Sequence, residues 1–237
     1  EPYVPRDEPV SAASGGKIPK ADRIEWLYIP DANTAMNALI SGEVDYYEAP
    51  PPDLIPILNQ SAGVKTEVLD PPATLGNQGM LRMNHLHPPF NKLKARQAVL
   101  KAIDQIEYMQ AGIGNPDFYK ECLSFYACGS PLETMAGTEM IAKRDVEGAK
   151  ALLAESGYAG ETVVILQATD IPVLNAASLV TAKNLRDIGM TVELQAMDWS
   201  TVTSRRASKE PPSAGGWNVF HTWWIGGDIA NPITHTG

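Results

Sequence analysis

Residues 81–108, LRMNHLHPPFNKLKARQAVLKAIDQIEY, predict a buried strand, a proline-rich corner and a long amphipathic helix in succession. Met80 and Arg82 alternate with Leu81 and Met83, which is the two-residue period of a strand. A strand followed by a helix within thirty residues points to a fold that mixes both kinds of element.

The proline corner ends this strand, because Pro88 and Pro89 have no amide hydrogen to donate to a ladder. Asn91 is placed to cap the next helix, since its side chain can accept from amides two or three residues further on. Gly112 and Gly114 are expected to end that helix. Its apolar residues recur at helical spacing and form one stripe, made of Ala95, Ala98, Val99, Ala102, Ile103 and Ile106.

The composition is that of an ordinary globular protein. The chain has 237 residues, which is enough to bury one large core or two small ones. Its 44% hydrophobic and 20% charged residues exclude a disordered chain. The net charge of −9 argues against a basic surface for nucleic acid. No apolar run approaches the roughly 20 residues that span a bilayer.

A first strand–helix–strand unit is predicted near the N-terminus. Residues 24–29 (IEWLYI) and 44–47 have the branched and aromatic content of strands. Asp31 or Asn33 can cap the helix between them, and Gly42 can end it. A unit of this kind indicates parallel strands.

A second unit of the same kind is predicted further along the chain. It consists of a strand at 163–167, a helix at 172–188 and a strand at 191–197. The other predicted elements are a strand at 64–69, a helix that Asp145 caps, a helix at 198–209 capped by Asp198 or Ser200, and a strand at 217–224.

The sequence around the proline corner resembles the solute-binding proteins of ABC importers. The similarity is to the large peptide-binding class, extracellular solute-binding family 5. Residues 28–48, YIPDANTAMNALISGEVDYYE, look like another segment of that family. The residues that carry the main match are Asn84, Pro88, Pro89, Phe90, Arg96, Gln97, Ala98, Ala102, Ile103 and Asp104.

This resemblance implies an α/β fold, the two-lobed periplasmic-binding-protein type II-like fold. Family members are about twice as long as this chain, which implies an interior fragment, mainly the second lobe with a mixed sheet and flanking helices. We expect residues 1–75 to hold part of the first lobe and the crossing segment. Residues 76–216 would form the second lobe, and residues 217–237 a strand and loop returning towards the first.

The resemblance also implies a function. The two lobes would close on a peptide or similar small polar solute and deliver it to an ABC permease in the membrane. Such a protein makes no covalent change to its cargo, so we expect neither an enzyme nor a cofactor. We expect a monomer, without nucleic acid, in the periplasm or outside the cell and associated with the membrane through the permease.

Cys122 and Cys128 enclose a short loop, ECLSFYACG. In the exported protein that the resemblance implies, such a pair is most simply a disulfide. A metal site is the other interpretation, but no second pair of ligands lies at zinc-like spacing.

The stretch 221–232, HTWWIGGDIANP, holds the candidate ligand-binding residues Trp223, Trp224 and Asp228. Tryptophan offers a broad face to apolar groups or cations. The resemblance implies that an aspartate four residues before Pro232 contacts the amino group of the ligand, and Asp228 has this spacing. A core tryptophan followed by an ordinary turn is the alternative.

Three further positions bear on this site. Asn84 is included among the expected ligand-binding residues. Asn231 stands where many family members have a second acid, and Trp224 is one residue further from the proline than the usual tryptophan. These departures leave the class of ligand open.

Two functions of other classes compete with transport. His85, His87 and His221 could serve a secreted metal-dependent hydrolase, since neighbouring histidines two apart share one face of a strand. A purely structural interaction domain is the other alternative. The sequence contains neither the G-x-S-x-G motif of serine hydrolases nor a glycine-rich phosphate loop.

Overall fold

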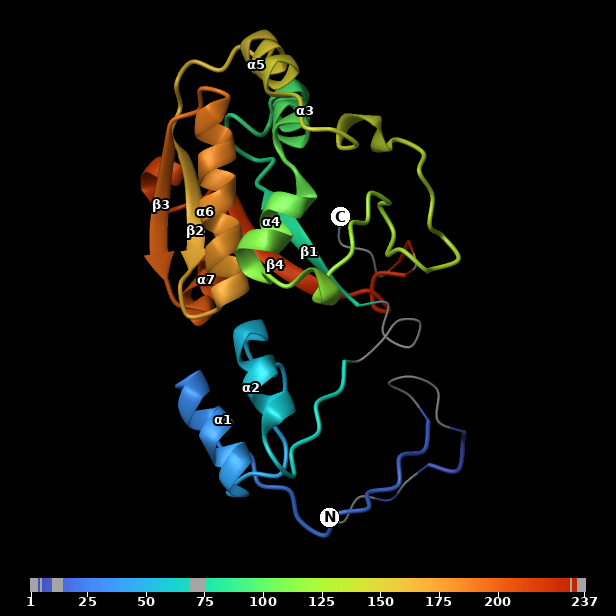
Figure 1. Ribbon diagram of the computed structural model, residues 1–237. Coiled ribbons are helices and arrows are strands. Elements are labelled where there is room, and N and C mark those ends of the chain that lie inside the picture. Colours follow the sequence, from blue (N-terminus) through green and yellow to red (C-terminus); the bar gives the residue numbers. More distant parts are fainter. Residues whose placement is uncertain (1–3, 5, 10–14, 69–75, 231, 234–237) are drawn as a thin grey trace. The chain divides into compact units, whose positions relative to one another are not determined.

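The computed structural model describes residues 4, 6–9, 15–68, 76–230 and 232–233. The chain divides into two compact units, residues 1–69 and 70–237 (Figure 1). No helix in the described ranges has the length and apolar character needed to cross a membrane.

The first unit holds short helices. Helix α1 (Ala32–Ser41) is followed by η1 (Pro52–Leu54) and α2 (Ile55–Gln60). Asp31 caps α1, because its carboxylate accepts from the amide of Thr34 at 2.8 Å, and Gly42 ends the helix with a φ of 76°. The small core of this unit is formed by Met36, Leu54 and Leu58.

The strands predicted in this unit are wrong. Residues 24–29, 44–47 and the described part of 64–69 are irregular, so the first strand–helix–strand unit does not form. Trp26 and Tyr28 are 87% and 90% exposed. A strand is held by hydrogen bonds to a neighbouring strand, and the described part of this unit provides none.

The second unit is built on a four-stranded mixed sheet (Figure 1). Its strands are β1 (Asn77–Met83), β2 (Val163–Ala168), β3 (Val192–Met197) and β4 (Val219–Ile225), in the order β1-β4-β2-β3. β1 pairs antiparallel with β4, whereas β2 is parallel to both β3 and β4. The second predicted strand–helix–strand unit is therefore confirmed, with α6 (Pro172–Asp187) as its helix.

Helices cover both faces of this sheet. Helices α3 (Leu93–Ala102), α5 (Val146–Glu155) and α6 pack on one face, and α7 (Trp199–Arg205) packs on the other. We call the hydrophobic cluster on the α3, α5 and α6 face the first core of the sheet, and the cluster on the α7 face the second core. Val163 and Ile165 of β2 lie in the first core, and Val164 and Leu166 lie in the second. Burial on both faces explains why β2 is a continuous apolar run. The remaining elements are α4 (Gln105–Gly112), η2 (Pro116–Phe118), η3 (Thr138–Met140) and η4 (Pro212–Ala214).

The single long helix predicted after the proline corner is in fact two helices. Ile103 and Asp104 have extended backbones with ψ of 154° and 120°, and they separate α3 from α4. The Asp104 carboxylate accepts from the amide of Ile106 at 2.8 Å and so caps α4. The predicted cap Asn91 is also wrong, because α3 starts after Lys92, which makes no side-chain cap.

Two other predicted caps are confirmed. The Asp145 carboxylate accepts from the amide of Gly148 at the start of α5, and Asp198 accepts from Thr201 at the start of α7. Hydrogen bonds from Lys101 and from Gly148 lower the pKa of Asp145.

The division of the chain at residues 75 and 216 remains a prediction. The strand of the predicted returning segment, β4, lies between β1 and β2 and is part of the sheet of the second unit.

Candidate ligand-binding site

The end of β4 projects beyond most of the sheet. β2 pairs with β4 only at Val219 and Phe220, whereas β1 accompanies β4 to its last residue, Ile225. Residues 77–79 of β1 and 223–225 of β4 therefore form a two-stranded extension, which we call the ribbon. The ribbon carries both predicted tryptophans.

The two tryptophans lie on opposite faces of the ribbon, because neighbouring residues of a strand alternate in direction. Trp223 is 40% exposed and Trp224 is 37% exposed. Trp223 shares its face with Val219 of the first core, and Trp224 shares the other face with Phe220 of the second core. One small ligand on one face therefore contacts one of the two indoles.

Asp228 lies in the turn that follows the ribbon. Its amide donates to the carbonyl of Ile225 at 2.9 Å, and the amide of Gly226 donates to the carbonyl of Gly76 at 2.7 Å. The Asp228 side chain is exposed, and within the described residues its carboxylate has no hydrogen bond or ion pair. The turn therefore holds the backbone, while no described residue pairs with the carboxylate. Asn231, which also belongs to this segment, lies outside the described residues.

Asn84 is buried at the corner after β1. Its side-chain amide donates to the carbonyl of Trp217 at 3.0 Å, and its carbonyl oxygen accepts from the amide of Leu86 at 3.0 Å. Its backbone amide donates to the carbonyl of Asn218 at 2.8 Å. These contacts join the end of β1 to the start of its neighbour β4, and a ligand-binding role for Asn84 stays a prediction.

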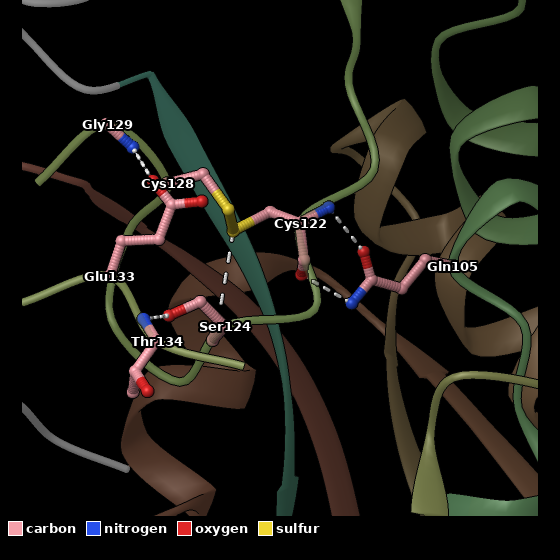
Figure 2. The surroundings of a disulfide bond; sticks show 7 residues. All are labelled: Gln105, Cys122, Ser124, Cys128, Gly129, Glu133 and Thr134. Carbon is pink, nitrogen blue, oxygen red and sulfur yellow. Dashed lines mark hydrogen bonds between the residues drawn. A yellow bond between two sulfur atoms is a disulfide. The ribbon is translucent and has the colours of Figure 1, made fainter. Parts of the chain in front are cut away.

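The predicted disulfide between Cys122 and Cys128 is present, with their Cα atoms 5.9 Å apart (Figure 2). The side chain of Gln105 pairs with both backbone groups of Cys122, donating at 2.7 Å and accepting at 3.0 Å. Within the loop, Ser124 accepts from the amide of Thr134 at 3.1 Å. Because Gln105 is the first residue of α4, its bonds to Cys122 hold the disulfide loop beside the start of that helix.

His221 is buried below the ribbon. Its Nε2 atom lies 2.9 Å from the hydroxyl of Thr181, and the hydroxyl of Tyr108 lies 2.7 Å from the same oxygen. Burial lowers the pKa of His221 to about 4 and raises the pKa of Tyr108 to about 12. Both side chains are therefore neutral near pH 7.

The geometry gives no support to the hydrolase alternative. His87 Nε2 lies 2.8 Å from the carbonyl of Lys209, and His221 is engaged with Thr181. The pKa of His85 is lowered, first by desolvation and then by two arginines nearby. Among the described residues, no three His, Cys, Asp or Glu side chains form a group that could hold a metal ion.

A cavity of about 310 Å³ lies beside the break between α3 and α4, and no predicted site residue lines it. Its charged lining combines Asp104 and Glu121 with Lys143 and Arg144. This cavity could not be predicted from the sequence, because its lining residues come from three separate segments of the chain.

The fold of the second unit is that of the type II periplasmic binding proteins, as two solved structures show. DppA from Helicobacter pylori, an ABC transporter-associated periplasmic binding protein in complex with the peptide STSA, matches with a TM-score of 0.63 at 19% identity, over 87% of this chain and 37% of that one. NikA from Brucella suis, in complex with Fe(III)-EDTA, matches with a TM-score of 0.63 at 20% identity, over 86% and 41%.

The chain belongs to the bacterial extracellular solute-binding proteins, family 5, whose middle-region model matches residues 3–234. It is 40% identical over 225 residues to a probable peptide ABC transporter periplasmic-binding protein, y4tO, of Sinorhizobium fredii (strain NBRC 101917 / NGR234). That alignment covers 94% of this chain and 42% of the relative, so the chain spans about two fifths of the relative's length. The family predicted from the sequence is confirmed.

Proposed function

We propose that the full-length protein captures a peptide, or a similar small polar solute, and delivers it to an ABC permease. It would act as a monomer in the periplasm or outside the cell, without nucleic acid and without chemical change to its cargo. The observation that carries this proposal is the exposed carboxylate of Asp228, which has no partner among the described residues and lies in the turn that directly follows the strand with two exposed indole rings. The name of the Sinorhizobium relative and the peptide in the Helicobacter structure support the same class of ligand.

The carboxylate of Asp228 suits the ammonium group of a peptide. A charge-assisted hydrogen bond between them is worth roughly 1.5–3 kcal/mol net, because the turn fixes the acceptor before the ligand arrives. The neighbouring indole covers apolar parts of the ligand and excludes water. The ligand then shifts the population towards the closed form by its extra contacts there.

Asp228→Asn tests this role, since it removes the charge and keeps the shape. We expect the affinity for the tetrapeptide Ala-Ala-Ala-Ala to fall by about one to two decades, as measured by calorimetry on the full-length protein. The melting temperature should stay the same, because the carboxylate has no partner among the described residues. Glu210→Gln, which removes another exposed acid, is the control and should leave binding unchanged.

Acetylation of the peptide's amino group completes the test. The acetylated peptide should bind the parent protein as weakly as the free peptide binds Asp228→Asn, and the variant should not discriminate between the two peptides. Equal binding of both peptides to the parent protein would reject the ammonium contact.

A further inference from the structure

Gly79 occupies the middle of β1, directly across from Trp223 in the antiparallel register. Residues paired in this way point to the same face of a sheet. Gly79 is exposed, and its φ lies outside the left-handed region. A Cβ atom built on it meets no atom within 4 Å among the described residues. Neither the backbone conformation nor a steric clash with a described residue therefore requires glycine at this position.

Glycine is an unfavourable choice inside a strand, because it has no side chain to pack and much conformational freedom to lose. Inside strands it often marks a place where another molecule approaches closely. Here the open space is bordered by the indole of Trp223, which is 40% exposed. Ile225 lies on the same face and is 48% exposed, so the β4 side of this space is apolar, while the polar Asn77 is paired with Ile225 on the β1 side.

We propose that Gly79 is a specificity-determining residue, which leaves room for a bulky apolar side chain of the bound peptide against the ring of Trp223. This inference rests on the proposed peptide-binding function and adds a selection by side-chain size. Asp228 holds the amino group of any peptide, whereas the space over Gly79 distinguishes one peptide from another. Trp224 takes no part in this selection, because it lies on the opposite face of the ribbon.

The test uses Ala-Ala-Ala-Ala and its four single-leucine variants as probes, with calorimetry on the full-length protein. In the parent protein, at least one leucine peptide should bind ten times more tightly than tetraalanine. Gly79→Val fills the space and should reduce that preference below twofold while tetraalanine binds within threefold of its original affinity. Gly79→Ala should fall between the two. Ala196→Val, which places the same valine side chain at an exposed position of β3, should leave the preference unchanged.

Each other result has a distinct meaning. A leucine preference that survives in Gly79→Val rejects the role of Gly79 and leaves the peptide-binding function standing. The same holds if no leucine peptide binds the parent protein better than tetraalanine. If none of the five peptides binds the parent protein, the proposed function fails, and the inference fails with it. Thermal melting shows that Gly79→Val is folded, and we expect it to be at least as stable as the parent.

Discussion

The buried His221 belongs to a small hydrogen-bonded group that connects β4, α6 and α4. The Thr181 hydroxyl, on α6, lies within hydrogen-bond distance of both His221 on β4 and Tyr108 on α4. The rings of Tyr108 and His221 are 6.1 Å apart between centroids. Because His221 and Thr181 are buried, protonation of His221 would place a charge where it is poorly solvated.

The first prediction concerns the pH dependence that follows from this burial. The folded protein holds His221 with a pKa of about 4, below the ordinary value of 6.5, so the unfolded chain binds more protons between these values. The contribution of neutral His221 to the free energy of unfolding is therefore fully present above pH 6.5, and it is lost as the pH falls towards 4. Between pH 7 and pH 5 the loss from this histidine is about 2 kcal/mol.

Denaturant unfolding at pH 7 and pH 5 measures this loss. His221→Gln keeps a partner for Thr181 but cannot titrate, so it should lose about 2 kcal/mol less than the parent over the same interval. The lowered pKa values of Asp145, Asp187 and Asp198 act at lower pH and do not interfere. An equal loss in parent and variant would show that His221 is accessible to protons in the folded state.

The break between α3 and α4 depends on one capping residue. The carboxylate of Asp104 satisfies the amide of Ile106, which a continuous helix would bond to a carbonyl four residues back. Arg144 supports the same corner, because it donates to the carbonyl of Ala102 at 2.8 Å and to the carboxylate of Asp187 at 2.7 Å. The break thus directs α4 onto α6.

The second prediction is that Asp104→Ala destabilises the second unit by about 1 kcal/mol, which is the usual value of an N-cap. Asp104→Asn is the matched control and should retain most of the stability, because asparagine caps equally well. Chemical denaturation with a constant m-value measures both variants. If alanine and asparagine have the same effect, the break is maintained by other contacts.

The elements that the sequence predicted correctly carry their signal locally. β2 is a continuous apolar run, α6 has helical periodicity and β3 alternates, and β2 pairs with β3, the next strand in the chain. The break at Ile103 could not be predicted from spacing, because Ile106 continues the apolar stripe across it. Asp104, a residue type common at helix starts, was the one local sign that a new helix begins there. The helical spacing of the apolar residues favoured a single helix instead.

Strand composition near the N-terminus was misleading for a different reason. Residues 24–29 have the branched and aromatic content of a strand, but hydrogen-bonded partners come from elsewhere in a fold and leave no local trace. The role of Gly79 was equally hidden, since its meaning comes from Trp223, which lies across the sheet. By contrast, the interest in the segment around Asp228 came from the resemblance to the family, and its ligand-binding role stays a prediction.

At the scale of the whole chain, each unit has its own hydrophobic core. The cluster around Leu58 contains only residues of the first unit, whereas both clusters on the sheet contain only residues of the second. The second unit also holds the disulfide. Its stability should therefore not depend on the first unit.

The third prediction is that residues 76–233 fold alone. We expect one cooperative melting transition within about 3 °C of the main transition of the whole chain, a difference equivalent to about 1 kcal/mol. Calorimetry under non-reducing conditions measures it. A truncated chain that is unfolded at room temperature would show that the first unit supplies part of the core.

The position of β4 in the middle of the sheet has a consequence for biosynthesis. More than half of this sequence separates β1 from β4, which is the only strand that pairs with β1 among the described residues. At about 5–20 residues per second, a ribosome needs on the order of 10 s to make the intervening segment. Throughout that time the nascent β1 has two open edges and no ladder, and the parallel pair β2–β3 can form without it. The four-stranded sheet can therefore be completed only after β4 has emerged from the ribosome, and until then the apolar residues of β1 lack their partner strand.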